Sequence, residues 1–419
     1  MTVIGLDDTD SRERGMCTTY VATRVGAALR ERGASVDGRW LIRLNPAVKH
    51  KTRGNAAIAI ETDANPGVAM AAASDVVGSL AELADERTHP GIVVAEEPIT
   101  SSVRAFGQRA IREILDRETA TAEIEAAGYR AATWKAGRGV IGALAAIGAS
   151  RALEEWTYEY IAYREPDRWG TERDVDRDSV FAAADAHYPA AWDTVDREEG
   201  EAVCVPAAPG PILYGIRGDD PHAVASVAAG IEAEPVHDRA LFLTNQGTDV
   251  HLEDATIEAV QERRAYRVTG RVVEPPATKA GGHVFFRIAD GTGQLACVAF
   301  EPTKRFRDRV RALRVGDAVT VAGEVSDGTL KLEKVAVRDL VEREAVTPTC
   351  PSCGRRMESA GANQGYRCRD CGERADSKTL TALDRDLELG WYEVPPCARR
   401  HVAKPLVRGG FDAPVHPER

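Results

Sequence analysis

Two cysteine pairs near the C-terminus constrain the fold of this chain more than any other feature. Cys350 and Cys353 form one CxxC pair, Cys368 and Cys371 form a second one after fourteen intervening residues, and a glycine follows each pair. Four thiolates in this pattern are typical of a tetrahedral zinc site that has no open ligand position. The spacing therefore predicts a structural Zn²⁺ in a zinc ribbon over residues 345–376. A redox dithiol is the alternative, but it gives no reason for a duplicated pair.

Length and composition exclude several classes of protein. The 419 residues allow two to four domains, and a hydrophobic content of 43% excludes a disordered chain. No run of about 18 apolar residues is present, and the N-terminus leads directly into a strand-like segment. We therefore expect a cytoplasmic protein with no signal peptide and no membrane association. Only nine of the 54 basic residues are lysine and the net charge is −11, which indicates adaptation to concentrated salt and does not exclude a nucleic-acid partner.

The hydrophobic periodicity predicts α/β structure in the first 255 residues. Segments VIGL, RWLIRL, AAIAIE and GIVVAEE read as strands, and helices are expected over 18–32, 68–84 and 103–117, with another after GRG. Residues 166–200 have no clear period. A smaller block over 201–255 has strands EAVCVP, ILYGIR and ALFLTN and a helix at HAVASVAAGIEA.

The next segment, residues 265–340, changes to β structure. Five strand-like runs follow one another, and one helix, TKRFRDRVRALR, falls between the third and fourth runs. This order is that of an OB barrel, although another small barrel is the alternative. After residue 376 we expect a short helix and then a tail rich in proline and arginine.

Three carboxylates lie at the end of the first predicted strand. Asp7, Asp8 and Asp10 fall within four residues, where their negative charges repel unless they share a cation. Hard divalent cations such as Mg²⁺ take carboxylate oxygens, so the cluster predicts a metal site, with a plain surface turn as the alternative. Thr18 follows a glycine turn at a predicted helix start, where free N–H groups can bind an anion or where the threonine simply caps the helix.

Basic and glycine-containing segments provide further candidate sites. No acid occurs over 38–60, which contains KTRGN, or over 126–153, which contains GRG. Either segment can bind phosphates, with a solvated basic face as the alternative. Residues 137–142 also match GxGxxG, but the preceding strand is poor and the expected acid is misplaced, which argues against a dinucleotide site. The candidate ligands in these two loops are Lys51, Arg53, Gly54, Asn55, Gly137, Arg138 and Gly139.

The C-terminal tail has basic residues without nearby acids. No carboxylate lies between Glu393 and Asp412, and an OB barrel followed by a zinc ribbon and a basic tail is typical of nucleic-acid-binding proteins. A zinc ribbon that binds protein is the alternative. The predicted RNA-contacting residues of the tail are Arg399, Arg400, Lys404 and Arg408.

Taken in order, the motifs of this chain resemble those of one archaeal family, the isoleucine-tRNA 2-agmatinylcytidine synthetases. The matching motifs are GLDDTDS, GMCTTY, RLNP, KTRGN, GRGVIGALAAIGA, LYGIRG, TNQGTD, the two CxxC pairs and PPCARRHVAKPL. The resemblance implies an ATP-dependent ligase that joins agmatine to C2 of the wobble cytidine of a CAU-anticodon tRNA(Ile), so that AUA is read as isoleucine. It implies that ATP is cleaved to AMP and that the cytidine C2 oxygen is activated by phosphorylation, and it suggests no obligate protein partner.

The resemblance also implies a domain plan. The plan is a kinase-like α/β catalytic domain over 1–195, a ferredoxin-like block over 196–260, an OB fold over 261–342, the zinc ribbon over 345–376 and the tail over 377–419.

Individual roles also follow from the resemblance. Asp7, Asp8 and Asp10 would hold Mg²⁺ against ATP, Thr18 would accept the γ-phosphate, and the KTRGN and GRG residues would line the ATP and cytidine site. Agmatine is dicationic, and Asp219 and Asp249 are candidates for binding it. His50 and Ala56 depart from the family pattern in the KTRGN loop. The competing interpretation is a non-catalytic RNA-binding protein, which would need neither the aspartate cluster nor the two loops.

Overall fold

The largest unit of the fold is a nine-stranded sheet. The computed structural model describes residues 1–49 and 54–419, so the predicted ligands Lys51 and Arg53 lie outside the described residues. The strand order is β5-β4-β1-β3-β2-β9-β6-β8-β7, and most neighbours are antiparallel. The strands of this sheet are β1 (Thr2–Asp7), β2 (Val36–Arg43), β3 (Ala56–Thr62), β4 (Gly91–Glu96), β5 (Arg130–Thr133), β6 (Thr157–Arg164), β7 (Ala191–Trp192), β8 (Ile212–Gly218) and β9 (Val236–Thr244).

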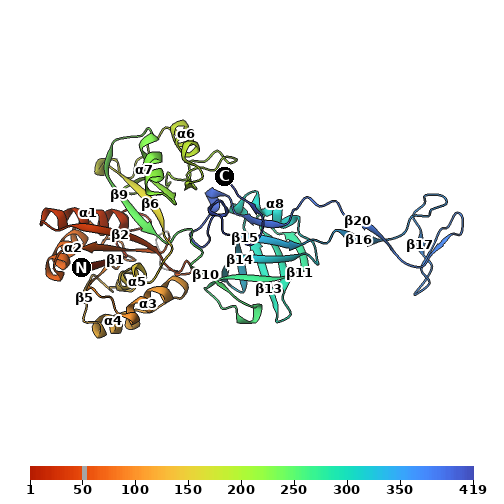
Figure 1. Cartoon of the computed structure of the whole chain (residues 1–419), viewed down its shortest axis with the longest axis horizontal. Coiled ribbons are helices and arrows are strands. Elements are labelled where there is room, and N and C mark those ends of the chain that lie inside the picture. The colour runs from red at the N-terminus through yellow and green to blue at the C-terminus, as the bar shows by residue number, and fades with distance from the viewer. Residues whose placement is uncertain (50–53) are drawn as a thin grey trace.

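Helices cover both faces of the first half of this sheet because β1, β3 and β4 are apolar on both sides. One face packs on α1 and α2 around Ile4 and Leu6, and the opposite face packs on α3, α4 and α5 around Val3. In the second half, α7 packs on β6 and β8, and α6 packs on α7 and β7 (Figure 1). The helices are α1 (Thr18–Glu31), α2 (Pro66–Leu80), α3 (Ser101–Arg112), α4 (Arg117–Ala126), α5 (Val140–Ser150), α6 (Arg177–His187) and α7 (Pro221–Gly230).

The two halves of the sheet meet at a short parallel seam between β2 and β9. Only Trp40–Leu243 and Leu41–Thr244 pair there, and the Asn245 side chain continues the pairing by bonding both the N–H and the carbonyl of Arg43. Strand β6 and helix α6 lie with β8, α7 and β9 in the second half. The predicted boundary between residues 195 and 196 falls inside this second half.

The OB barrel is present with the predicted order of elements. Strand β11 pairs with β12 and β14, and β15 pairs with β13 and β14, so the barrel closes around a core that includes Val268 and Val321. The short helix α8 lies between β13 and β14, as predicted. The elements are β10 (Leu252–Asp254), β11 (Ala265–Thr278), β12 (Val284–Ala289), β13 (Gln294–Ala299), α8 (Phe306–Arg311), β14 (Ala318–Ser326) and β15 (Thr329–Asp339).

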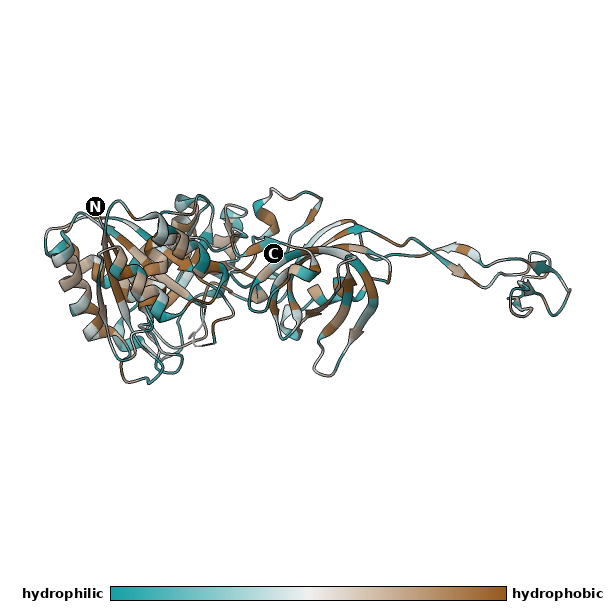
Figure 2. Cartoon of the chain, turned by 90° about the horizontal axis from the view of Figure 1, so that it is seen from below, coloured by the Kyte–Doolittle hydropathy of each residue, from teal (hydrophilic) through white to brown (hydrophobic). Residues whose placement is uncertain are grey.

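The zinc ribbon projects from the barrel on a two-stranded stalk. Figure 2 shows that the ribbon at the end of this stalk is largely hydrophilic. The stalk consists of β16 and β20, and the chain then returns to the barrel, where β21 pairs with β15. The remaining elements are β16 (Arg343–Val346), β17 (Glu358–Ser359), β18 (Tyr366–Arg367), β19 (Arg374–Ala375), β20 (Thr379–Ala382), β21 (Gly390–Glu393), β22 (Val415–His416) and the 3-10 turns Pro166–Arg168, Ile257–Ala259, Glu301–Thr303, Pro396–Ala398 and Leu406–Arg408.

Two local predictions were wrong, and one predicted helix has a different end. EAVCVP is a turn segment and not a strand, and no α-helix follows residue 376 in the described chain, because strands β20 and β21 occupy that region. The predicted helix over 103–117 is present as α3 but ends earlier, at Arg112, and Asp116 caps the separate helix α4 by accepting the N–H of Thr119. No helix in the described part of the chain is long and apolar enough to cross a membrane.

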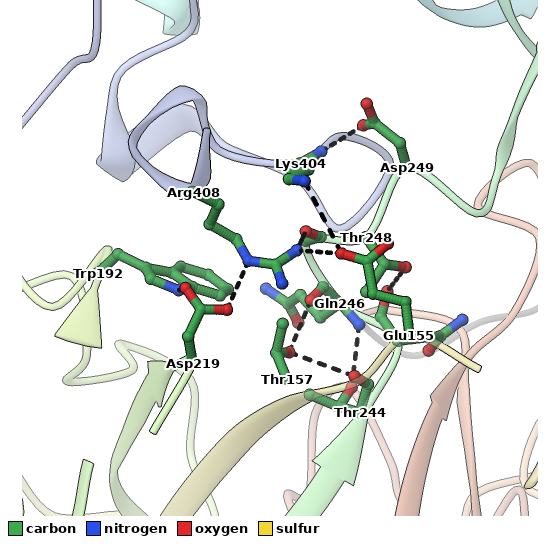
Figure 3. Close-up of polar contacts among 12 residues, drawn as sticks. Glu155, Thr157, Trp192, Asp219, Thr244, Gln246, Thr248, Asp249, Lys404 and Arg408 are labelled. Carbon is green, nitrogen blue, oxygen red and sulfur yellow. Dashed lines mark hydrogen bonds and ion pairs between the residues drawn. The ribbon is translucent and has the colours of Figure 1, made fainter. Parts of the chain in front are cut away.

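The C-terminal tail joins the barrel to the second half of the sheet through ion pairs. Arg408 donates to Asp219 at 2.6 Å and to Glu155 at 3.0 Å, and Lys404 lies between Glu155 and Asp249 (Figure 3).

Two further arginines of the tail are also engaged. Arg399 pairs with Asp193 and Glu393, and Arg400 pairs with Glu324 and Glu333 of the barrel. The basic tail is therefore bound to the protein's own carboxylates.

Replacing Arg399 should destabilise this junction strongly. Arg399, Asp193 and Glu393 are 5%, 4% and 1% exposed, so Arg399→Ala leaves buried carboxylates without their cation. Breaking a buried pair from one side costs about 3–5 kcal/mol. Urea unfolding followed by tryptophan fluorescence should show a lower midpoint. Arg32→Ala, which removes an exposed pair with Asp75, is the control, and equal midpoints for the two variants would contradict this role.

Candidate functional site

A cavity of about 390 Å³ opens where the two halves of the sheet meet. Its lining includes the end of β1, the start of α1, the end of β2 and strands β6 and β8, so both halves contribute side chains. The predicted site residues that line it are Asp7, Asp8, Asp10, Thr18, Gly54, Asn55 and Arg138.

The aspartates enter the cavity because β1 ends at Asp7 and the chain turns there. Asp8 adopts a left-handed backbone with φ 60°, which aspartate tolerates better than most residues, and its N–H donates to the Asp7 carboxylate at 2.7 Å. Burial, followed by the charge of Asp8, raises the pKa of Asp7 well above its usual range. Burial also raises the pKa of Asp8, and Arg138 opposes this shift from 2.9 Å. A buried carboxylate pair of this kind can hold a divalent cation.

The GxGxxG match has a structural explanation that involves no dinucleotide. A Cβ on Gly139 would lie 2.4 Å from the Gly91 nitrogen and 2.6 Å from the Asp7 carbonyl oxygen, and a Cβ on Gly142 would lie 2.0 Å from the Asp7 carboxylate. The glycines therefore let helix α5 approach the end of β1. Gly137 has φ 64° and, like Gly139, does not line the cavity, whereas Gly142 does.

Thr18 is the first residue of α1 and lines the same cavity. Its hydroxyl accepts a hydrogen bond from that of Thr9 at 3.0 Å, and its side chain is buried. The N-cap residue of this helix, Cys17, makes no capping hydrogen bond with its side chain. The helix N-terminus and the hydroxyl therefore lie beside the carboxylates.

The local sequence patterns did not predict an arginine–glutamate–arginine group in the same cavity. Glu159 on β6 lies 3.2 Å from Arg43 of β2 and 3.5 Å from Arg217 of β8, and all three line the cavity. The Nε–H group of Arg43 is buried and has no hydrogen-bond partner among the described residues, whereas the buried Nε of Arg217 is the atom that lies 3.5 Å from Glu159. Burial opposes ionisation of Glu159, but the two guanidinium groups prevail and lower its pKa. This group of three side chains carries one more positive than negative charge, which suits an anionic ligand.

The residues predicted for other contacts lie elsewhere. Asp219 and Asp249 do not line the cavity, and they are paired with Arg408 and Lys334. Arg399, Arg400, Lys404 and Arg408 are all in ion pairs with the protein's own acids. RNA contact by these four residues stays a prediction, and their geometry supports a structural role.

The four cysteines fit a structural zinc ion. Their ligand atoms lie within 4.8 Å of one another, with Sγ–Sγ distances of 3.3 Å for Cys350–Cys371 and 3.4 Å for Cys353–Cys368. Zn–S bonds of about 2.3 Å in a tetrahedron place sulfur atoms about 3.8 Å apart, so these atoms need to move outward by only about 0.4 Å. Each pair ends in a left-handed glycine, and the N–H groups of Gly354 and Gly372 bond back to Cys350 and Cys368. Within residues 1–49 and 54–419, no other group of three or more potential ligands lies this close together.

Adding one methyl group to α5 tests how the carboxylates are held. Gly142→Ala should displace the Asp7 side chain, because the new Cβ would overlap the carboxylate. A displacement of this size should lower ATP turnover about 100-fold. The control is Gly78→Ala on α2, where the nearest atom to a Cβ is 4.0 Å away. This change should leave turnover intact and slightly stabilise the helix. If the Gly142→Ala variant kept wild-type ATP turnover, the reaction would not depend on the present position of the Asp7 carboxylate.

Four family models match successive parts of the chain. They are the TiaS TCKD domain over residues 3–68, the TiaS FLD domain over 137–251, an OB-fold nucleic acid binding domain over 266–333 and the TiaS C-terminal zinc ribbon domain over 347–387. The multidomain plan of an α/β region, an OB barrel and a zinc ribbon is thereby confirmed.

Full-length relatives agree with these matches. The chain is 54% identical to the isoleucine-tRNA 2-agmatinylcytidine synthetase TiaS of Haloquadratum walsbyi and 45% identical to that of Methanosarcina acetivorans, with 100% of each chain covered. The crystal structure of a TiaS complex with its isoleucine tRNA and ATP superposes with a TM-score of 0.91 at 42% identity and covers 100% of this chain and 99% of its own. A TiaS complex with the same tRNA, AMPCPP and agmatine gives 0.89 at 40% identity, with the same coverage. The chain therefore belongs to the TiaS family of isoleucine-tRNA 2-agmatinylcytidine synthetases.

Proposed function

We propose that this protein joins agmatine to C2 of the wobble cytidine of a CAU-anticodon tRNA(Ile), at the expense of ATP. The observation that carries this proposal is the full-length similarity to TiaS enzymes, whose crystal structures include complexes with an isoleucine tRNA and a nucleotide. The protein is then an ATP-dependent tRNA-modifying ligase, and its product reads AUA as isoleucine. Because tRNA and ATP are cytoplasmic substrates, we place the reaction in the cytoplasm.

The chemistry requires activation of a poor leaving group. The C2 oxygen of cytidine leaves easily only after a phosphoryl group is attached to it. The primary amine of agmatine then attacks C2, the C2–O bond breaks, and the oxygen departs with phosphate. The base must leave the anticodon stack to reach a buried cavity, as in other enzymes that modify bases.

The cavity has groups suited to the phosphoryl-transfer part of this reaction. Asp7 and Asp8, with Asp10 beside them, would hold Mg²⁺, which neutralises phosphate oxygens when bound. Thr18, the first residue of α1, would accept a phosphoryl group. The buried Nε–H group of Arg43, which also lines the cavity, can donate to a phosphate oxygen.

The fold is compatible with the two predicted domain types, but the ferredoxin-like unit would begin before residue 196, since it includes β6 and α6. Strands β6, β8 and β9 with helices α6 and α7 are consistent with a ferredoxin-like unit, and the preceding half would be the kinase-like catalytic part.

Nucleoside mass spectrometry tests the reaction. The protein, in high-KCl buffer with ATP, Mg²⁺, agmatine and a CAU-anticodon tRNA(Ile) transcript, should produce a cytidine heavier by the agmatine adduct only when all components are present. Asp8→Ala should abolish the adduct, whereas Asp75→Ala, which removes an exposed carboxylate from α2, should not. Tight tRNA binding without adduct or ATP cleavage would instead support the non-catalytic RNA-binding protein.

A further inference from the structure

A second groove, of about 810 Å³, lies between the first half of the sheet and the OB barrel. One wall is the loop Pro46, Ala47, Val48 and Lys49, and the other includes Ser326, Asp327 and Lys331 of the β14–β15 hairpin. Val48 lines both this groove and the cavity that holds the aspartates. The groove is therefore adjacent to the reaction site and leads away from it.

The groove contains cations that the protein does not neutralise itself. Lys49, Arg263 and Lys331 line it, and none of them forms an ion pair with a carboxylate of the described residues. All three acids of the groove have partners. Glu324 pairs with Arg400, Glu262 accepts the N–H groups of Asp327 and Gly328, and the Asp327 carboxylate accepts the hydroxyl of Ser326. Arg12 and Arg400 complete a lining of five basic and three acidic residues, in a chain of net charge −11.

The two walls are held together by one buried asparagine. The Asn45 amide nitrogen donates to the carbonyl of Arg112 at 2.8 Å and to that of Arg263 at 2.9 Å, while its oxygen accepts the N–H of Ala47 at 2.7 Å. Arg263 in turn donates its N–H to the carbonyl of Val325 on β14. These hydrogen bonds fix the position of the loop after β2 relative to the barrel, so the two walls of the groove are held in place.

We propose that this groove binds the single-stranded RNA next to the reacting cytidine, with phosphates contacted by Lys49, Arg263 and Lys331. This inference rests on the proposed function. A base extruded into the cavity stays covalently joined to its neighbours, so the strand must leave through an opening beside the cavity. The β14–β15 loop is also one of the loops with which OB folds bind oligonucleotides. Unpaired cations along such a path favour RNA over a protein partner.

Salt-dependent binding tests the groove. Lys49→Ala combined with Lys331→Ala should weaken binding of the CAU-anticodon tRNA(Ile) transcript about tenfold, because two phosphate contacts are lost. A plot of log K against log [KCl] should become shallower by about 1.4, since each phosphate contact on a single strand contributes about 0.7. ATP affinity should not change.

The matched control removes two exposed arginines elsewhere. Arg30→Ala combined with Arg104→Ala, on α1 and α3, changes the net charge equally and should keep wild-type tRNA affinity. Equal affinity and slope for both double variants would overturn the groove proposal. If the wild-type protein forms no agmatine adduct, the proposed function fails, and this result is separate from the binding comparison.

Discussion

The close approach of helix α5 to the end of strand β1 is the constraint on which the site depends. Gly139 and Gly142 remove the side chains that would otherwise occupy the space of the Asp7 backbone and carboxylate. This contact keeps the carboxylates buried and places Arg138, which precedes the same helix, against Asp8. Like charges that are largely withdrawn from water repel each other, and Arg138 offsets part of this repulsion at Asp8. A divalent cation would offset more of it, which links the packing of α5 on β1 to phosphate chemistry.

Charge is used differently in the two parts of the chain. Along the tail, Arg399, Arg400 and Arg408 form ion pairs that join the barrel to the sheet. In the cavity wall around Glu159 and in the groove between the loop after β2 and the barrel, guanidinium and ammonium groups outnumber the acids that face them. Ion pairs of the tail therefore stabilise the junction between the barrel and the sheet, whereas the excess basic groups lie where an anionic substrate would enter.

Local patterns predicted those features that depend on neighbours in the sequence. The two CxxC pairs and the DDTD cluster were recognisable because each lies in a short segment. The OB strand order was recognisable because its strands follow one another along the chain. Arg43, Glu159 and Arg217 are distant in sequence, and only the pairing of β2, β9, β6 and β8 brings them together. The basic residues of the tail were interpreted as free because the acids that pair with them, such as Asp193 and Asp219, are also distant. The single carboxylate between two arginines could have been found only from the sheet topology.

In the proposed mechanism, one cavity transfers a phosphoryl group to the cytidine C2 oxygen and then exchanges that oxygen for agmatine. The most direct measurement uses a tRNA(Ile) transcript with ¹⁸O at C2 of the wobble cytidine. After complete reaction with ATP and agmatine, mass spectrometry of the products should find the label in inorganic phosphate. Label in AMP would show adenylyl activation instead, and label retained in the modified nucleoside would show that the C2–O bond is not broken. Either result would contradict the mechanism.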